Sequence, residues 1–130
     1  MIVVDASAVV DALIDHSEVG DRARRRIHGP GHSLHAPHLL DLEVTNAVRR
    51  LVAAGSLSQA AATGTLADLV LLRVSLYPHR PQLARIWALR RNLTPYDAAY
   101  LALAEVLRVP LLTTDRRLAR EARKHVEVLA

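Results

Sequence analysis

The chain has 130 residues, 51% of them hydrophobic, which is the length and composition of one folded domain over residues 1–130 and not of a disordered chain. Cysteine is absent, which excludes disulfide bonds and thiolate metal sites. The formal net charge is +4 and 16 of the 17 basic residues are arginine, a composition that suits either a phosphate-rich partner or a solvated basic surface.

The first half of the chain alternates short apolar runs with longer segments of helical periodicity. Ile2–Val4 is predicted to form a strand, and the N-terminus lacks the basic stretch and long apolar run of a signal peptide. Helices are predicted over Ser7–Ile14 and over the arginine-rich Val19–Ile27. A short strand at Leu34–Ala36 and a helix over His38–Ala54 are predicted to follow, because apolar residues recur there with the helical period.

The second half continues the same alternation. The longest run without a charged residue, Leu51–Ala67, is interrupted by glycine, serine and glutamine, so it makes a poor membrane span and we expect a cytoplasmic protein. The remaining predicted helices are Leu57–Leu72, Gln82–Arg91, Thr94–Leu107 and Arg116–His125, and the remaining predicted strands are Val74–Leu76, Leu111–Thr114 and Val126–Leu129. Strands that alternate with helices predict an α/β fold, a three-layer α/β/α sandwich around about five short, mainly parallel strands.

Four acidic residues follow predicted strands or begin predicted helices. They are Asp5, Glu43, Asp97 and Asp115. Because the carboxyl ends of parallel strands meet at one edge of a sheet, we expect these carboxylates to lie close together, where each raises the pKa of the others. Oxygen ligands without cysteine suit Mg²⁺, with Mn²⁺ as a substitute. In an arginine-rich protein, such a metal site indicates the hydrolysis of phosphodiester bonds.

Each of these acids also has an explanation as part of a helix terminus. Asp5 or Ser7 could cap the first helix, and Asp115 could cap the helix that follows it. Thr94 and Asp97 have the spacing of a capping box. A protein whose acids were only caps would be a non-catalytic basic module that binds RNA or another partner.

Periodicity leaves two further questions open. Asp41 and Glu43 are two positions apart on one predicted helix, so they point to opposite sides and either could be the site acid. His32, His35 and His38 recur every three residues, which allows a zinc site, although a proline between the last two makes a regular helix there unfavourable. Incidental loop histidines explain this spacing better.

Other classes of α/β enzyme are excluded by missing residues. A phosphatase with an aspartate nucleophile needs a second aspartate two residues after Asp5, where this chain has Ser7. A receiver domain needs a lysine at the end of a late strand, and Lys124 is the only lysine. No glycine-rich P-loop motif is present.

Four stretches together resemble the PIN-domain ribonucleases, and most closely the VapC-type toxins of bacterial toxin–antitoxin pairs. They are IVVDASAVV at the start, APHLLDLEVTNAVRRL at 36–51, LTPYDAAYLALAE at 93–105 and PLLTTDRRL at 110–118. The similarity covers essentially the whole chain, in order and with matching spacing. Each motif alone is weak, whereas the four in this order are specific.

The resemblance implies the identity of the catalytic and metal-binding acids. The four acids of the family's site fall on Asp5, Glu43, Asp97 and Asp115, and this alignment selects Glu43 over Asp41. Ribonucleases of this kind use Mg²⁺, cut RNA by hydrolysis, and leave 3′-hydroxyl and 5′-phosphate ends. We therefore expect a Mg²⁺-dependent endoribonuclease.

The resemblance also implies supporting residues. Ser7, Asn46 and Thr114 fall beside the acids and are expected to support them. Arg116 and Arg117 stand where some PIN domains carry a further acid, so one tightly held Mg²⁺, with a second arriving with the substrate, is expected. These two arginines are candidates to contact the RNA backbone.

Partners are implied in the same way. Toxins of this kind commonly form homodimers and are silenced by a cognate antitoxin that occupies the active-site groove. The apolar helix predicted over Leu57–Leu72 is a plausible dimer or antitoxin surface, and ordinary packing in the core is an equally good explanation of its composition.

Overall fold

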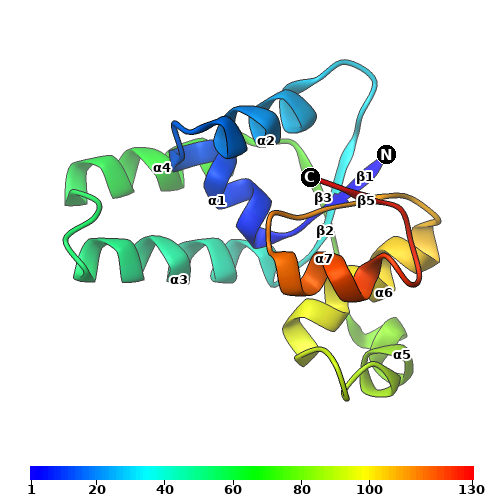
Figure 1. The fold of residues 1–130 in the computed structure, drawn as a ribbon. Helices are drawn as coiled ribbons and strands as arrows, with labels where there is room; N and C mark the ends of the chain where they lie inside the picture. The colour runs from blue at the N-terminus through cyan, green and yellow to red at the C-terminus, as the bar shows by residue number, and fades with distance from the viewer.

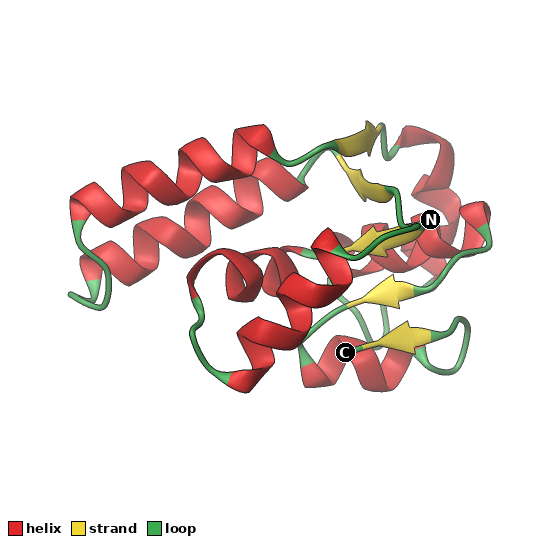
Figure 2. Ribbon diagram, turned by 90° about the horizontal axis from the view of Figure 1, so that it is seen from above, coloured by secondary structure: helices red, strands yellow, loops and turns green.

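The computed structural model describes all residues 1–130 and contains one sheet of five strands, all of them parallel, in the order β3-β2-β1-β4-β5 (Figure 2). The strands are β1 (Ile2–Val4), β2 (Leu34–Pro37), β3 (Val74–Tyr77), β4 (Leu111–Leu112) and β5 (Val128–Leu129). The three residues of β1 are fully buried, as expected for a central parallel strand that is covered on both faces. The predicted α/β fold is therefore confirmed.

Seven helices surround this sheet (Figure 1). They are α1 (Ala6–Ile14), α2 (Glu18–His28), α3 (Leu40–Ala53), α4 (Gln59–Leu71), α5 (Leu83–Ala88), α6 (Pro95–Leu107) and α7 (Arg116–Ala122). Figure 1 shows α1 and α2 on one side of the strands and α5 and α6 on the other, while α3 and α4 form a hairpin that extends beyond the sheet. None of the helices is both long enough and apolar enough to cross a membrane.

Helix α6 forms the centre of the core. Its residues from Ala98 to Ala104 are all buried, and the helix packs against β1, β2 and β4. Thr94 caps its N-terminus through a 3.2 Å hydrogen bond from the Asp97 N–H, and Pro95 occupies the first turn, as the sequence predicts. Alanine at four of the seven buried positions lets the helix lie close to the strands.

Every predicted strand and helix forms, but several are shorter than expected, among them the last strand, which covers only Val128–Leu129. The strand predicted over Leu111–Thr114 ends at Leu112, and the two threonines that follow bind residues after β1 through the Thr113 hydroxyl and the Thr114 N–H. The helix predicted over Gln82–Arg91 begins as a 3₁₀ turn at Arg80–Gln82 and is α-helical only over Leu83–Ala88. The last predicted helix ends at Ala122.

The strand order places a topological switch beside β1. The chain runs from β1 outwards to β2 and β3, then returns to the other side of β1 to form β4 and β5. Val4 of β1 is paired with Leu112 of β4, so the residues that follow each strand emerge side by side. In open parallel sheets, ligands bind in the crevice at such a point, at the carboxyl ends of the strands.

The three histidines at 32, 35 and 38 lie apart from that crevice and do not act together. His35 is buried on β2, with Nε2 2.8 Å from the Ser33 hydroxyl and Nδ1 2.6 Å from the Tyr77 hydroxyl. His32 and His38 are exposed. Because both ring nitrogens of His35 are engaged within the chain, its role is to join β2 to β3.

Candidate active site

Asp5 lies directly after β1 and is buried, with 4% of its surface exposed. Its Oδ1 accepts hydrogen bonds from the Ser7 hydroxyl at 2.7 Å and from the Ala8 N–H at 3.0 Å, so the side chain caps α1. Its Oδ2 accepts a 2.7 Å hydrogen bond from the Thr113 hydroxyl. Burial raises the pKa of Asp5 to about 6, the charge of Asp115 adds to this, and the three hydrogen bonds oppose it.

Thr113 and Ser7 connect the ends of β1 and β4. Their hydroxyl oxygens lie 3.2 Å apart, and the Thr113 oxygen also accepts the Asp115 N–H at 3.1 Å. The predicted supporting residue Ser7 therefore lies in this network. Thr114 takes part only through its backbone N–H, which donates to Ser7 Oγ at 3.1 Å, and the side chain that supports Asp5 is that of Thr113.

Asp115 caps α7 with one carboxylate oxygen. Its Oδ1 accepts the N–H groups of Arg117 at 2.8 Å and of Leu118 at 3.1 Å. Its Oδ2 accepts no hydrogen bond within the chain, and Asp115 is one of the residues that line the crevice beside Asp5. The cap explanation for Asp115 is thus compatible with a role in the site, because the cap leaves one carboxylate oxygen free.

Asp97 lies in the first turn of α6, and 22% of its side-chain surface is exposed. Burial raises its pKa, the charge of Asp115 raises it further, and the guanidinium of Arg117 lowers it. The Arg117 Nη2 atom lies 3.6 Å from Asp97 Oδ2. Since Thr94 caps the helix, the Asp97 carboxylate is not required as a cap.

Glu43 reaches the same crevice from the first turn of α3. The hydroxyl of Tyr100, a residue of α6 that is 1% exposed, donates a 2.7 Å hydrogen bond to Glu43 Oε1. Burial raises the pKa of Glu43, and the nearby charge of Asp97 raises it further. The exposed Asp41 lies against another cavity, beside Leu66 of α4, so the structure brings Glu43 and not Asp41 to the other acids.

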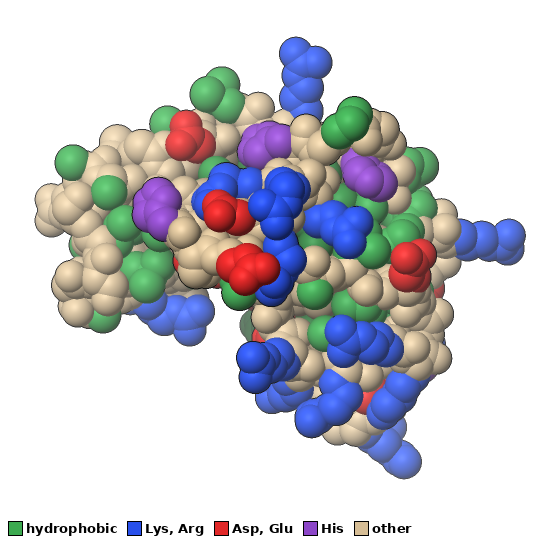
Figure 3. Space-filling view, turned by 45° about the horizontal axis from the view of Figure 1, so that its top comes forward, with side chains coloured by type: hydrophobic (Ala, Val, Ile, Leu, Met, Phe, Trp, Pro, Cys, Tyr) green, Lys and Arg blue, Asp and Glu red, His purple; other side chains and the backbone are tan.

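These residues line a cavity of about 340 Å³ at the carboxyl ends of β1 and β4. We call it the acid cavity, because its walls carry all four predicted acids: Asp5, Glu43, Asp97 and Asp115. The four come from four separate segments of the chain. In Figure 3 the molecule is hollowed between the α3–α4 hairpin and the part that carries α7. Four carboxylates that line one cavity favour a positive counter-charge there.

The residues that line the acid cavity beside the four acids differ from those predicted from the sequence. Asn46 is exposed and its Oδ1 accepts a 3.0 Å hydrogen bond from Arg49, away from the cavity wall. Arg50 and Tyr100 line the cavity and were not predicted. Helical spacing contains the signal for both, because Arg50 is seven residues after Glu43 and Tyr100 is three residues after Asp97.

The cavity walls carry carboxylate oxygens, which are the kind of ligand that a hard divalent cation prefers. Glu43 Oε2, Asp97 Oδ1 and Asp115 Oδ2 accept no hydrogen bond within the chain, so their lone pairs are free for a ligand. No three His, Asp or Glu side chains are gathered closely enough in this structure to enclose a metal ion. The donors are therefore of the kind that Mg²⁺ prefers, and a shared ion would draw them together.

Comparison with known proteins shows the family of the chain. The family model described as PIN domain matches residues 2–124. Ribonuclease VapC1 of Mycobacterium tuberculosis is 47% identical over 118 residues, covering 90% of this chain and 87% of that protein. Ribonuclease VapC12 of the same species is 37% identical over 128 residues, covering 98% and 97%. The crystal structure of M. tuberculosis VapC20, described as a Sarcin-Ricin loop cleaving toxin, superposes with a TM-score of 0.74 at 16% identity and covers both chains fully. The chain belongs to the PIN-domain family and, within it, to the VapC ribonucleases.

Proposed function

We propose that this protein is a Mg²⁺-dependent endoribonuclease that hydrolyses RNA phosphodiester bonds in the acid cavity. The observation that carries the proposal is the meeting of Asp5, Glu43, Asp97 and Asp115, from four segments of the chain, in one cavity at the switch point of the sheet. The names of the similar proteins support it, because VapC1 and VapC12 are called ribonucleases. Because the proposed substrate is RNA, we expect the protein to act in the cytoplasm.

A divalent cation supplies activation of water and neutralisation of the charge that develops on the phosphoryl group. Glu43, Asp97 and Asp115 would hold it with their free oxygens, and Asp5 completes the negative charge of the site. Asp5 is held by Ser7, Ala8 and Thr113, so its carboxylate keeps one orientation. Mn²⁺ would serve in place of Mg²⁺, since both prefer oxygen ligands.

Two features of this chain favour one tightly held ion. The acid cavity has four carboxylates that come together, and the two residues after Asp115 are Arg116 and Arg117. Arg117 already lies beside Asp97 and supplies part of the counter-charge. A second ion would arrive with the phosphates of the substrate.

Arg50 is the basic residue on the wall of the acid cavity and is free to contact the substrate. It is exposed on α3 and makes no ion pair within the chain. A guanidinium in this place can bind a phosphate oxygen next to the scissile bond by two parallel hydrogen bonds. We assign it the positioning of the RNA strand.

The protein would act as the toxin of a toxin–antitoxin pair, as a homodimer that a cognate antitoxin silences. The surface available for such partners lies on the α3–α4 hairpin. Helix α4 buries Ala62, Thr65 and Leu69 in the core but leaves Val70 83% and Leu71 78% exposed. One face of the helix therefore packs in the core, and we propose its exposed apolar face as the partner surface.

The decisive experiment is cleavage of cellular RNA by purified protein, with Mg²⁺ and with a chelator. Wild-type protein should cut only with the metal, and Asp97→Asn should not cut. Glu43→Gln should lose activity, whereas Asp41→Asn, a matched change two residues earlier on an exposed position, should retain it. Equal cutting by Asp97→Asn and wild type would refute the proposed nuclease.

A non-catalytic basic module is the second candidate, because Asp5 and Asp115 do cap their helices. The two candidates differ most at Asp97, whose carboxylate is not a cap. In a module without catalysis, Asp97→Asn would change neither activity nor metal binding. In the nuclease it removes cleavage and the rise in melting temperature that Mg²⁺ produces, while the fold remains.

A further inference from the structure

A second cavity, of about 570 Å³, lies between α2 and α7 and adjoins the acid cavity. Four arginines line it, and we call it the arginine cavity: Arg22 from α2, Arg116 and Arg120 from α7, and Arg123, the C-cap residue of α7. Asp115 lines both cavities, so the two adjoin at the start of α7. Figure 3 shows that Lys and Arg side chains outnumber acidic ones over the part of the molecule that carries α7.

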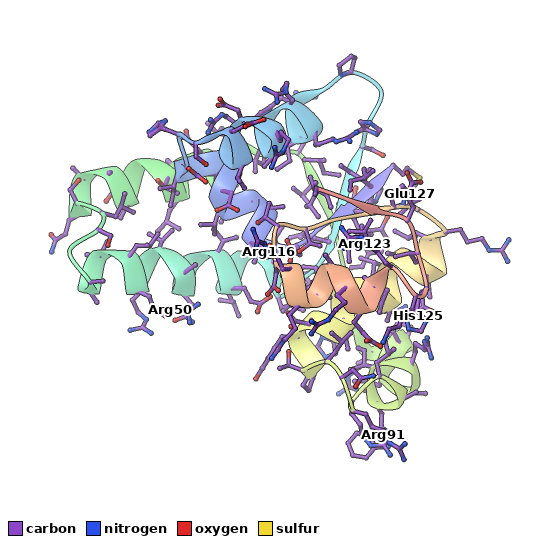
Figure 4. All side chains as sticks on the ribbon, viewed as in Figure 1. Arg50, Arg91, Arg116, Arg123, His125 and Glu127 are labelled. Carbon is purple, nitrogen blue, oxygen red and sulfur yellow. The ribbon has the colours of Figure 1, made fainter.

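The three arginines of α7 share one face of the helix. They occupy positions i, i+4 and i+7, which places Arg116, Arg120 and Arg123 in a row. Figure 4 shows Arg116 and Arg123 on the same side of α7, with Arg91 far from both. Arg117 lies off this face and turns towards Asp97, so the structure separates the two arginines that the sequence had grouped.

These three side chains have no partner within the chain. None of them makes an ion pair or a side-chain hydrogen bond, whereas Arg22 pairs with the exposed Glu18 at 3.3 Å. Like charges one turn apart repel, and a cation in the first turn, where Arg116 lies, also opposes the helix dipole. An anion bound across the row would relieve both effects.

We propose that the arginine cavity binds consecutive phosphates of the RNA strand on one side of the cleavage point. This inference rests on the proposed nuclease function and adds the path that the substrate takes. The row from Arg116 to Arg123 spans about 10 Å along the helix axis, which exceeds one phosphate group. The guanidinium fork suits phosphate oxygens, and no aromatic residue lines the cavity to stack on a base. Recognition here is therefore of the backbone and not of the sequence.

The test measures binding of a short, labelled single-stranded RNA of mixed sequence in the presence of chelator, so that cleavage does not enter. Arg120→Gln combined with Arg123→Gln removes two phosphate contacts at exposed positions away from the acids. The counterion effect predicts affinity weakened by about 25-fold at about 0.1 M salt, and a slope of log affinity against log salt that is smaller by about 1.4. The melting temperature should not fall appreciably below that of the wild type, because neither side chain has a partner to lose.

The matched control is Arg73→Gln combined with Arg91→Gln, which removes the same charge from exposed positions at the β3 edge and near α5. This pair should weaken binding by less than about threefold, since it removes no phosphate contact. Equal weakening by both pairs would show a general charge effect and overturn the proposal. If the variant with Arg120→Gln and Arg123→Gln, the α7 pair, binds poly-glutamate more weakly than the wild type but binds RNA equally well, the proposal is overturned in favour of an acidic protein partner.

The same variants separate this inference from the proposed nuclease. In the cleavage assay the α7 pair should raise KM and leave kcat close to that of the wild type, because the acids are untouched. If Asp97→Asn retains full cleavage but the α7 pair loses RNA affinity, the nuclease site is wrong and the arginine cavity stands. If Asp97→Asn is inactive and the α7 pair binds RNA as the control does, the cavity is wrong and the nuclease stands.

Discussion

The hydroxyl of Thr113 donates a 2.7 Å hydrogen bond to Asp5 Oδ2, joining two residues that lie 108 positions apart in the chain. The contact follows from the register, because Val4 and Leu112 are paired and each of these residues comes one position later. Thr113 thereby links the site acid of β1 to the segment that carries Asp115, whose N–H it also accepts.

Thr113→Val should therefore damage the site while nearly preserving side-chain volume. It leaves Asp5 Oδ2 without its donor, which costs about 1–3 kcal/mol of unfolding free energy and raises the pKa of Asp5 further. The acid limb of the pH–rate profile should move to higher pH. Thr114→Val is the control, because that hydroxyl makes no hydrogen bond. Identical profiles for the two variants would contradict the assigned role of Thr113.

Tyr100→Phe should lower activity without removing any acid. Loss of the hydroxyl frees Glu43 from its orientation and removes a hydrogen bond that lowers the Glu43 pKa. By analogy with other residues that orient metal ligands, Mg²⁺ affinity or cleavage should fall about 10- to 100-fold. Tyr96→Phe, on the same helix but 62% exposed, should behave like the wild type. Mg²⁺ titrations of the cleavage rate make the comparison.

Arg117→Gln should strengthen metal binding. The Arg117 guanidinium neutralises part of the Asp97 charge, so it competes with a cation for that carboxylate. Because the arginine is largely exposed, its removal is worth less than about 1 kcal/mol, or a two- to fivefold decrease in the Mg²⁺ concentration that half-saturates the rise in melting temperature. Arg116→Gln removes the same charge one residue earlier and should leave this concentration unchanged. A weaker response to Mg²⁺ in Arg117→Gln would contradict the competition.

Asp5→Asn should stabilise the metal-free protein at neutral pH. The pKa of Asp5 is raised to about 6 from 3.8, so the folded state binds this proton more tightly than the unfolded state. The resulting stability is fully present below about pH 4 and is lost as the pH rises through about 6, with an upper limit of about 3 kcal/mol. Asp5→Asn should not lose this stability as the pH rises. At pH 7.5 the variant should be more stable than the wild type but inactive.

Urea unfolding of both proteins at several pH values between about 4 and 7.5 checks this prediction. The difference between the two curves isolates Asp5, because His35, whose pKa is lowered by burial, contributes equally to both. The contribution of His35 to the free energy of unfolding depends on pH in the opposite direction, because it is lost as the pH falls. Parallel curves for wild type and Asp5→Asn would show that ionisation of the buried Asp5 carboxylate does not lower the free energy of unfolding.

The fold, and the meeting of the four acids in one cavity, could be predicted from the sequence, because much of the signal lies in neighbouring residues. Short apolar runs followed by Asp5 and Asp115 mark strand ends, and the cap pattern of Thr94 and Pro95 marks the start of α6. Such features depend on neighbours in the chain. The choice of Glu43 over Asp41 could not be made from periodicity, because it depends on which side of α3 faces α6.

The parts that the sequence did not reveal depend on contacts between distant segments. Selecting Thr113 over Thr114 requires the register of β4 against β1. Assigning Arg117 to Asp97 and Arg116 to the arginine cavity requires the direction of α7 relative to α6. Asn46 was expected beside the acids but lies on the outer side of α3, where it binds Arg49.

The position of β4 in the sheet has a consequence for the cell that makes this protein. Strand β4 lies next to β1 at the centre of the sheet, although it is among the last segments to be synthesised. A nascent or truncated chain that stops before Leu111 lacks Asp115, the Thr113 contact to Asp5 and the arginine row together. Such a chain lacks the complete acid cavity, so we expect cutting ability to appear only after the last strands have joined the sheet.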